Sequence, residues 1–211
     1  MKRYFEKSDF DLFEIDGLEA RMSVIREAIQ PVFQYYGDTY TDYVNDYTNF
    51  EGSFHIAQHR RRTTNPPEST WSAIGGDNRG YKKYPHIQIG INDEYIFMFL
   101  SLIDNPKHEK EMAEFLLDHP TLWNDLPNDF YVSGDHTKTK TNKADEEAVR
   151  KTLQRLIKVK KGEVMLGRII TPESGLLGDG QKQEEFFKET LEVLLPIYKA
   201  LLDLYQEEED R

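Results

Sequence analysis

The sequence predicts a single α+β domain over residues 1–211, with a central, mainly antiparallel sheet packed by N-terminal and C-terminal helices. Apolar residues recur at helical spacing near both ends of the chain, whereas the middle alternates as extended strands do. The order of these segments is not a regular alternation of strand and helix, which favours an α+β arrangement over a parallel sheet. Strands are expected near residues 54–60, 70–75, 86–91, 95–102, 130–133 and 163–170.

The first helix is predicted from an apolar stripe that runs through residues 18–36. Asp16 precedes the stripe as a plausible N-cap, and Gly37 follows it as a stop. Pro31 lies inside the pattern and should kink the helix, because proline removes a backbone donor. Tyrosines and a valine over residues 40–47 predict a second, shorter helix.

The period changes to two at Phe54, which begins the segment predicted to form the sheet. Residues 86–91 alternate isoleucine with His86, Gln88 and glycine, and residues 95–102 are apolar throughout. Asn92-Asp93 separates these two segments and favours a tight turn, so a hairpin is expected.

The second half of the chain returns to helical periodicity and is interrupted by two further strands. A helix is expected around residues 112–116, and another over residues 149–157 after the acidic residues Asp145 and Glu146. A long final helix carries apolar residues from 187 to 205, with Pro196 as an internal kink.

Composition limits the class of protein. The formal net charge is −11, and there is no cysteine, which excludes disulfides and zinc–thiolate sites. The N-terminus lacks the apolar segment of a signal peptide, and the longest apolar run falls far short of the ~20 residues of a membrane helix. We therefore expect a cytoplasmic protein without a membrane partner, and no cofactor is predicted.

A basic segment stands out against this acidity. Between His55 and Gly90 there are six lysines and arginines against two acidic residues. If residues 54–62 are extended, His55, His59 and Arg61 share the face opposite Phe54. The inward isoleucines of residues 86–91 would then turn His86 and Gln88 toward the same side. The candidate catalytic residues are His55, His59 and His86, and the candidate anion- or ligand-binding residues are Arg61, Arg62, Arg79, Lys82, Gln88 and Trp71.

These residue types suit an anionic ligand. Arginine presents a planar fork of donors that matches a phosphate, and histidine transfers protons near neutral pH. The expected ligand is a phosphorylated small molecule, a nucleotide or a nucleic-acid end, bound in a cleft lined by histidine and arginine.

Three alternatives remain open. The basic stripe is also compatible with a non-catalytic interaction module that docks an acidic protein partner, whose identity the sequence does not give, or with a charged edge strand that blocks further pairing. A metal-dependent hydrolase is the weaker alternative, with His86, Asp135 and His136 as its weak candidate ligands. No metal site is favoured, because His55 and His59 would lie ~13 Å apart along a strand.

The segments HIAQHRRRTTNPP (55–67), TWSA (70–73), RGYKKYPHIQIG (79–90), DH (135–136) and VKKGE (159–163) resemble the YktB-like family of bacterial proteins of unknown function. GLEARM (17–22) and LLPIY (194–198) extend the similarity over nearly the whole chain. The resemblance implies an α+β fold and a cytoplasmic protein of Gram-positive type, and it implies no activity. This chain has Arg60 where alanine is usual, so Arg61 and Arg62 match the arginine pair of the family.

Overall fold

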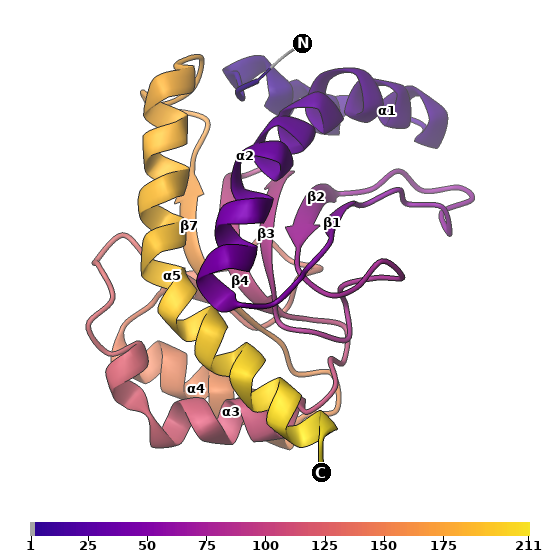
Figure 1. Ribbon diagram of the computed structural model, residues 1–211. Coiled ribbons are helices and arrows are strands. Elements are labelled where there is room, and N and C mark those ends of the chain that lie inside the picture. The colour runs from indigo at the N-terminus through magenta and orange to yellow at the C-terminus, as the bar shows by residue number, and fades with distance from the viewer. Residues whose placement is uncertain (1–2) are drawn as a thin grey trace.

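The computed structural model describes residues 3–211 and contains a seven-stranded sheet with helices packed on it (Figure 1). The strand order is β1-β2-β3-β4-β7-β5-β6, and every neighbouring pair is antiparallel. This confirms the predicted α+β class and the antiparallel sheet. The strands are β1 (Phe54–Ile56), β2 (Ser69–Ile74), β3 (His86–Asn92), β4 (Ile96–Leu102), β5 (Tyr131–Ser133), β6 (Asn142–Lys143) and β7 (Val164–Ile170).

Helices occupy both ends of the chain and the segment between β4 and β7. The N-terminal elements are the 3-10 helix η1 (Lys7–Glu14), α1 (Leu18–Val24), the π-helical segment η2 (Ile25–Ile29) and α2 (Gln30–Thr48). The later elements are α3 (Glu109–Asp118), the 3-10 helix η3 (Pro120–Leu122), α4 (Glu146–Lys158) and α5 (Gly180–Glu209). Figure 1 shows α2 and the long α5 lying across one face of the sheet, with α3 and α4 at one end.

The two faces of the sheet are covered differently. Isoleucines of β3 and aliphatic residues of β4 and β7 join the helices in one large core. The opposite face carries a smaller apolar cluster that includes Phe97, Phe99 and Met165. Segments 75–85 and 134–141 cover it, since Tyr81 contacts His86 there and Tyr95 donates to the carbonyl of Thr139. We call this side the loop-covered face.

The N-terminal helix differs from its prediction at both ends. Gly17, rather than Asp16, is the N-cap of α1. Gly37 does not stop the helix, because α2 continues to Thr48 and absorbs the predicted second helix. Glycine is required at this position for packing: a Cβ there would lie 2.5 Å from the ring of Phe54. Glycine often ends helices, but Gly37 lies inside α2 and lets β1 pack closely against this helix.

The first strand is shorter than predicted. β1 pairs with β2 only from Phe54 to Ile56, and His59 adopts a positive φ of 50°. The alternation inferred for residues 54–62 consequently fails beyond Ile56, so His59 and Arg61 lie outside the sheet. The prediction that they extend the face of His55 is wrong, because the chain turns away at residues 60–61.

The predictions of the three later helices are confirmed. Asp145 caps α4 by accepting a hydrogen bond from the backbone of Ala148 at 2.8 Å. Helix α5 continues through Pro196, and Figure 1 shows it bending along its length. Within residues 3–211, no helix combines the length and the apolar character needed to span a bilayer.

Candidate functional site

Cationic side chains from three parts of the chain line a cavity of about 610 Å³, which we call the basic cavity. It lies between the turn at Arg61, the loop over residues 77–84, Lys107 and the last turns of α5. Its lining residues are Arg61, Asp77, Arg79, Gly80, Tyr81, Lys82, Lys83, Tyr84, Lys107, Tyr205 and Glu209. Five are cationic and two are acidic, in a chain whose net charge is −11.

Some of this positive charge is already paired. Lys82 lies 2.5 Å from the carboxylate of Asp104, and Lys107 lies 2.7 Å from Glu209 at the end of α5. The hydrogen bond from Lys82 is the main cause that lowers the pKa of Asp104. By contrast, none of the ion pairs found among residues 3–211 involves Arg61, Arg79 or Lys83. These three cations are available to an external anion.

The loop that carries Arg79 is held by its own hydrogen bonds. The carboxylate of Asp77 accepts from the backbone N–H groups of Arg79 at 2.8 Å and Gly80 at 3.1 Å. The first of these bonds is the main cause that holds the pKa of Asp77 below its usual value. Tyr84 donates to the same carboxylate at 3.2 Å. Arg79 is therefore presented on a fixed turn, and Asp77 is engaged by the loop itself.

Tyr81 forms the wall between the basic cavity and two histidines, the half-buried His55 and the buried His86. Its ring lies 5.3 Å from the ring of His55 and 4.8 Å from that of His86. Its hydroxyl accepts a hydrogen bond of 2.8 Å from the indole of Trp71. The predicted ligand residue Trp71 thus contacts this wall and does not line the basic cavity.

His86 and Gln88 point to the loop-covered face, as the alternation predicted, but neither is open to solvent. His86 is 0% exposed and Gln88 is 2% exposed. The Nδ1 atom of His86 lies 2.9 Å from the carbonyl of Tyr84, so it carries the proton and Nε2 is the acceptor. Burial lowers the pKa of His86 to about 4, which keeps the ring neutral.

Polar atoms without a hydrogen-bond partner gather under the loops. Among residues 3–211 they include Nε2 of His55, Nε2 of His86 and the amide nitrogen of Gln88. The amide oxygen of Gln88 accepts from Ser101 at 3.0 Å, so only its donor end is unsatisfied. A buried polar atom without a partner costs about 1–3 kcal/mol, so such a group usually marks bound water or a ligand.

The remaining predicted residues are placed elsewhere. His59 contacts Thr70 through Nε2 at 3.1 Å, and burial, followed by the charges of Arg62 and Lys82, lowers its pKa to about 4. Arg62 donates to the backbone carbonyls of Asn65 and Pro66. The structure therefore brings Arg61, Arg79 and Lys82 together in the basic cavity. It places His55, His86, Gln88 and Trp71 behind Tyr81, and leaves His59 and Arg62 at the sheet edge.

Sequence reasoning missed the part of the cavity that comes from distant segments. Lys107 follows β4, and Tyr205 and Glu209 belong to the end of α5. The rings of Tyr205 and Tyr84 lie 4.8 Å apart and join the two sides of the cavity. No local motif connects these residues, so only the fold reveals them.

The weak metal candidates are engaged in other contacts. Asp135 accepts hydrogen bonds from the backbone and hydroxyl of Thr137. His136 is bonded to Glu163 through Nδ1 at 2.8 Å. In the described part of the chain, no three or more histidine, cysteine or acidic residues are grouped to hold a metal ion.

Comparisons with known proteins give a consistent result. A family model described as a domain of unknown function, DUF1054, matches residues 5–198. A UPF0637 protein of Enterococcus faecalis is 45% identical over 195 residues, covering 92% of this chain and 96% of that protein. A UPF0637 protein of Listeria monocytogenes is 44% identical and covers 94% of this chain and 97% of its own length. A UPF0637 protein of Shouchella clausii is 42% identical and covers 94% of each chain.

Proposed function

Because the chain belongs to the DUF1054 family, whose description names no activity, we propose a function from the chemistry of the basic cavity: it binds a phosphorylated small molecule. The family also confirms the resemblance seen in the sequence, and its members named above are bacterial. The single observation that supports the proposal is the convergence of Arg61, Arg79 and Lys83, all without ion-pair partners in residues 3–211, on one cavity.

The size and shape of the cavity favour a small ligand. Ligand pockets typically enclose about 300–1,000 Å³, and about 610 Å³ lies within that range. Arginine binds phosphate through two parallel hydrogen bonds, whereas lysine adds a point charge at the edge. The rings of Tyr84 and Tyr205 add an apolar wall, which is compatible with a nucleotide as well as a simple sugar phosphate.

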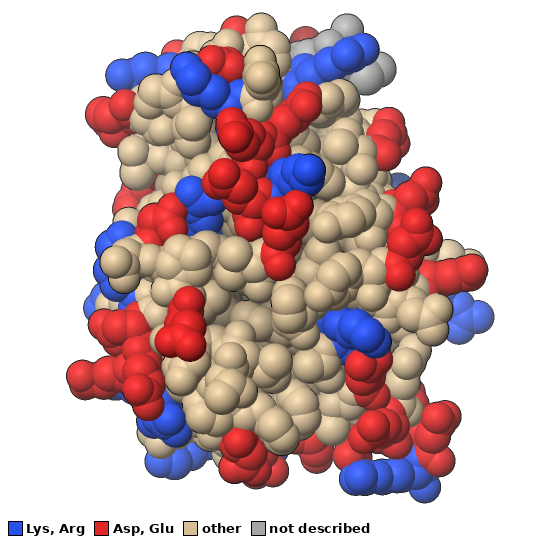
Figure 2. All heavy atoms as spheres, turned by 60° about the vertical axis from the view of Figure 1, so that its left-hand side comes forward, with Lys and Arg blue, Asp and Glu red and all other residues tan. Residues whose placement is uncertain are grey.

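The charge of the whole molecule argues against a long nucleic acid. Carboxylates are spread over the face seen in Figure 2 and gather in its upper half. A strongly acidic surface repels an extended phosphate backbone, whereas a recessed basic cavity still attracts a compact anion. We therefore favour a phosphorylated metabolite over a nucleic-acid end as the ligand of the basic cavity.

The proposal concerns binding and assigns no reaction to the basic cavity. His55, His59 and His86, the candidate catalytic residues, do not line it, and Tyr81 separates two of them from it. Docking of an acidic protein partner is the competing interpretation. A recessed cavity favours a small anion over a protein surface, which would bury a wide and flatter area.

A thermal-shift experiment tests the proposal. Inorganic phosphate, pyrophosphate and adenosine monophosphate are titrated separately into the protein at low salt. A ligand present at a hundred times its dissociation constant stabilises the folded state by about 2.7 kcal/mol, so at least one of these probes should raise the melting temperature by several degrees. Arg61→Ala and Arg79→Ala should each reduce the shift, because each removes an unpaired cation.

Arg62→Ala is the matched control. Arg62 is a neighbouring arginine, but its guanidinium binds the carbonyls of Asn65 and Pro66 and does not line the cavity. The control should lower stability slightly while keeping the ligand-induced shift. Equal loss of the shift in all three variants, or no shift with any probe, contradicts the proposal. Retention of a stoichiometric acidic protein by the wild type together with no shift supports the docking interpretation instead.

A further inference from the structure

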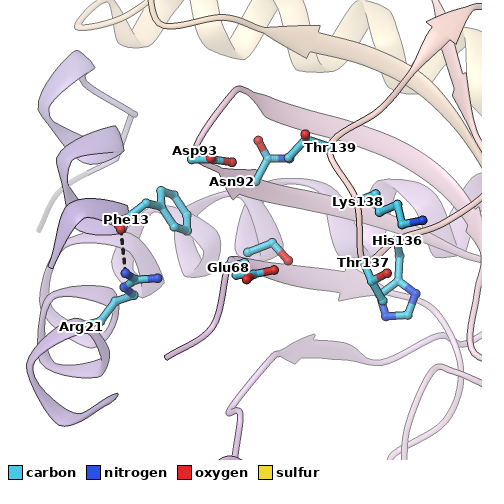
Figure 3. A pocket seen from close by; sticks show the side chains of 10 residues that line it. Phe13, Arg21, Glu68, Asn92, Asp93, His136, Thr137, Lys138 and Thr139 are labelled. Carbon is cyan, nitrogen blue, oxygen red and sulfur yellow. Dashed lines mark hydrogen bonds between the residues drawn. The ribbon is translucent and has the colours of Figure 1, made fainter. Parts of the chain in front are cut away.

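A second cavity lies on the loop-covered face, away from the residues of the basic cavity. Its outer part encloses about 400 Å³ between the N-terminal helices, the ends of β2 and β3, and the segment 136–139 (Figure 3). A small inner part of about 20 Å³ continues toward the sheet. Ser69, Asn92 and His136 line both parts, so the two spaces adjoin at these residues. We call the combined space the sheet-face cleft.

His136 stands where the two parts of the cleft meet and is fixed by a buried carboxylate. Glu163 accepts hydrogen bonds from Nδ1 of His136 at 2.8 Å, from the backbone of His136 at 2.7 Å and from the backbone of Asp104 at 2.9 Å. Burial opposes the ionisation of Glu163, but these hydrogen bonds outweigh it and hold the pKa of its carboxyl below its usual value.

This contact determines the form of the imidazole. Because the carboxylate accepts a hydrogen bond from the N–H at Nδ1, the neutral ring keeps its lone pair on Nε2. Among residues 3–211, Nε2 of His136 has no hydrogen-bond partner. A general base in enzymes is often a histidine that donates one ring N–H to a carboxylate and keeps the other ring nitrogen free to accept a proton.

The inner end of the cleft presents a hydrogen-bond donor in apolar surroundings. The amide nitrogen of Gln88 is buried and unpartnered, and its residue lines the inner part together with Trp71, Phe97 and Met165. A volume of about 20 Å³ admits a single small group such as a water molecule or a carbonyl oxygen. A donor of this kind, excluded from water, stabilises negative charge that develops on oxygen.

We propose that the sheet-face cleft is a hydrolytic site for a neutral carboxylic ester, with His136 as the general base and the amide of Gln88 as the donor to the carbonyl oxygen. The charged side chains that line the outer part balance, with Glu68 and Asp93 against Arg21 and Lys138, and this absence of net charge favours a neutral substrate over an anion. Figure 3 shows these side chains around the opening. The ester site is thus chemically distinct from the phosphate site.

The reaction uses water as the nucleophile. Nε2 of His136 removes a proton from water while the water oxygen bonds to the carbonyl carbon, and the electron pair of the C=O bond moves to oxygen beside Gln88. Collapse of this intermediate restores the C=O bond and breaks the ester bond. The leaving alkoxide takes the proton from Nε2 of His136, which gives an acid and an alcohol. Ser69 is not hydrogen-bonded to His136 in the structure, which favours water over a serine nucleophile.

Hydrolysis of p-nitrophenyl acetate tests the inference. The full-length protein should hydrolyse this ester faster than an equal concentration of free imidazole. His136→Gln should lower the rate by about 10²-fold, the lower range for general-base catalysis. Gln88→Leu, which keeps the size of the side chain, should lower it by about 10²-fold, as loss of an oxyanion donor does. The control His119→Gln removes an exposed histidine at the end of α3 and should leave the rate unchanged.

Glu163→Gln tests whether the imidazole of His136 must be oriented by the carboxylate of Glu163 in order to act. It should reduce the rate while His136 remains, and circular dichroism checks that the variant is folded. If Glu163→Gln fails to fold, His136→Gln and Gln88→Leu still decide the question. A wild-type rate no higher than that of free imidazole, or an unchanged rate in His136→Gln, overturns the inference. Neither result affects phosphate binding in the basic cavity, so the two proposals fail independently.

Discussion

The buried imidazole of His86 should make the stability of this protein depend on pH between neutrality and about pH 4. Burial lowers the folded-state pKa of His86 to about 4, whereas a histidine in the unfolded chain titrates near 6.5. A folded-state pKa below the unfolded value means that the contribution is fully present above pH 6.5 and is lost as pH falls toward 4. The two values imply a loss of about 2 kcal/mol by pH 5, at up to about 1.4 kcal/mol per pH unit.

Substitution His86→Asn isolates this contribution. The shorter amide can still donate toward the carbonyl of Tyr84, as Nδ1 of His86 does at 2.9 Å, but it does not titrate. Urea unfolding at pH 7 and pH 5 gives the free energy of unfolding of each protein. Carboxylates such as Glu163 and Asp104 also stabilise the folded protein less as pH falls, because their pKa values are lowered by folding. Both proteins contain these carboxylates, so their contributions cancel in the difference.

The difference in stability between wild type and His86→Asn should shrink by about 2 kcal/mol from pH 7 to pH 5. His119→Asn is the matched control, because it removes an imidazole at an exposed position, and an equal change in its stability difference would show that burial is not the cause. A difference for His86→Asn that does not change with pH would show that His86 is charged or accessible in the folded protein, and the reasoning from burial would be refuted.

Three further substitutions test the packing and the buried hydrogen bonds of the fold. Gly37→Ala should destabilise the protein by about 1–3 kcal/mol in urea unfolding, because its Cβ meets the ring of Phe54 at 2.5 Å; Phe54→Leu in the same chain should recover part of that loss. Arg21→Met should cost about 3 kcal/mol by the same assay, because the buried guanidinium donates to three backbone carbonyls that would lose their donor. Trp71→Phe should cost about 1 kcal/mol through the lost hydrogen bond to Tyr81, and ring-current shifts measured by NMR should report movement of Tyr81.

The sequence predicted the parts of the fold that depend on local periodicity. Alternating isoleucines placed β3, and the side chain of Asn92 accepts from the backbone of Glu94 and Tyr95 in the expected tight turn. Prediction from the sequence failed where tertiary packing overrides the local preference of the residues. Gly37 continues a helix because a ring packs over it, and β1 ends at Ile56 because the chain turns away from the sheet.

The candidate site was only partly predictable for the same reason. Local charge density indicated Arg61, Arg79 and Lys82, which share one cavity. The period of two also placed His86 and Gln88 on the face opposite the helices. It did not indicate that two loops bury that face, because coverage by segments such as 134–141 depends on contacts distant in sequence. The link between His136 and Glu163 spans 27 residues and has no sequence motif.

Calorimetric titration of pyrophosphate into the wild type and into the double variant Arg61→Ala/Arg79→Ala is the most direct test of the account. At low salt the wild type should bind one pyrophosphate per chain, with an affinity that falls as salt rises, because the cations act through charge. The double variant should bind at least tenfold more weakly while its unfolding free energy stays close to that of the wild type. Equal affinity in the two proteins would place the anion outside the basic cavity and contradict the central claim.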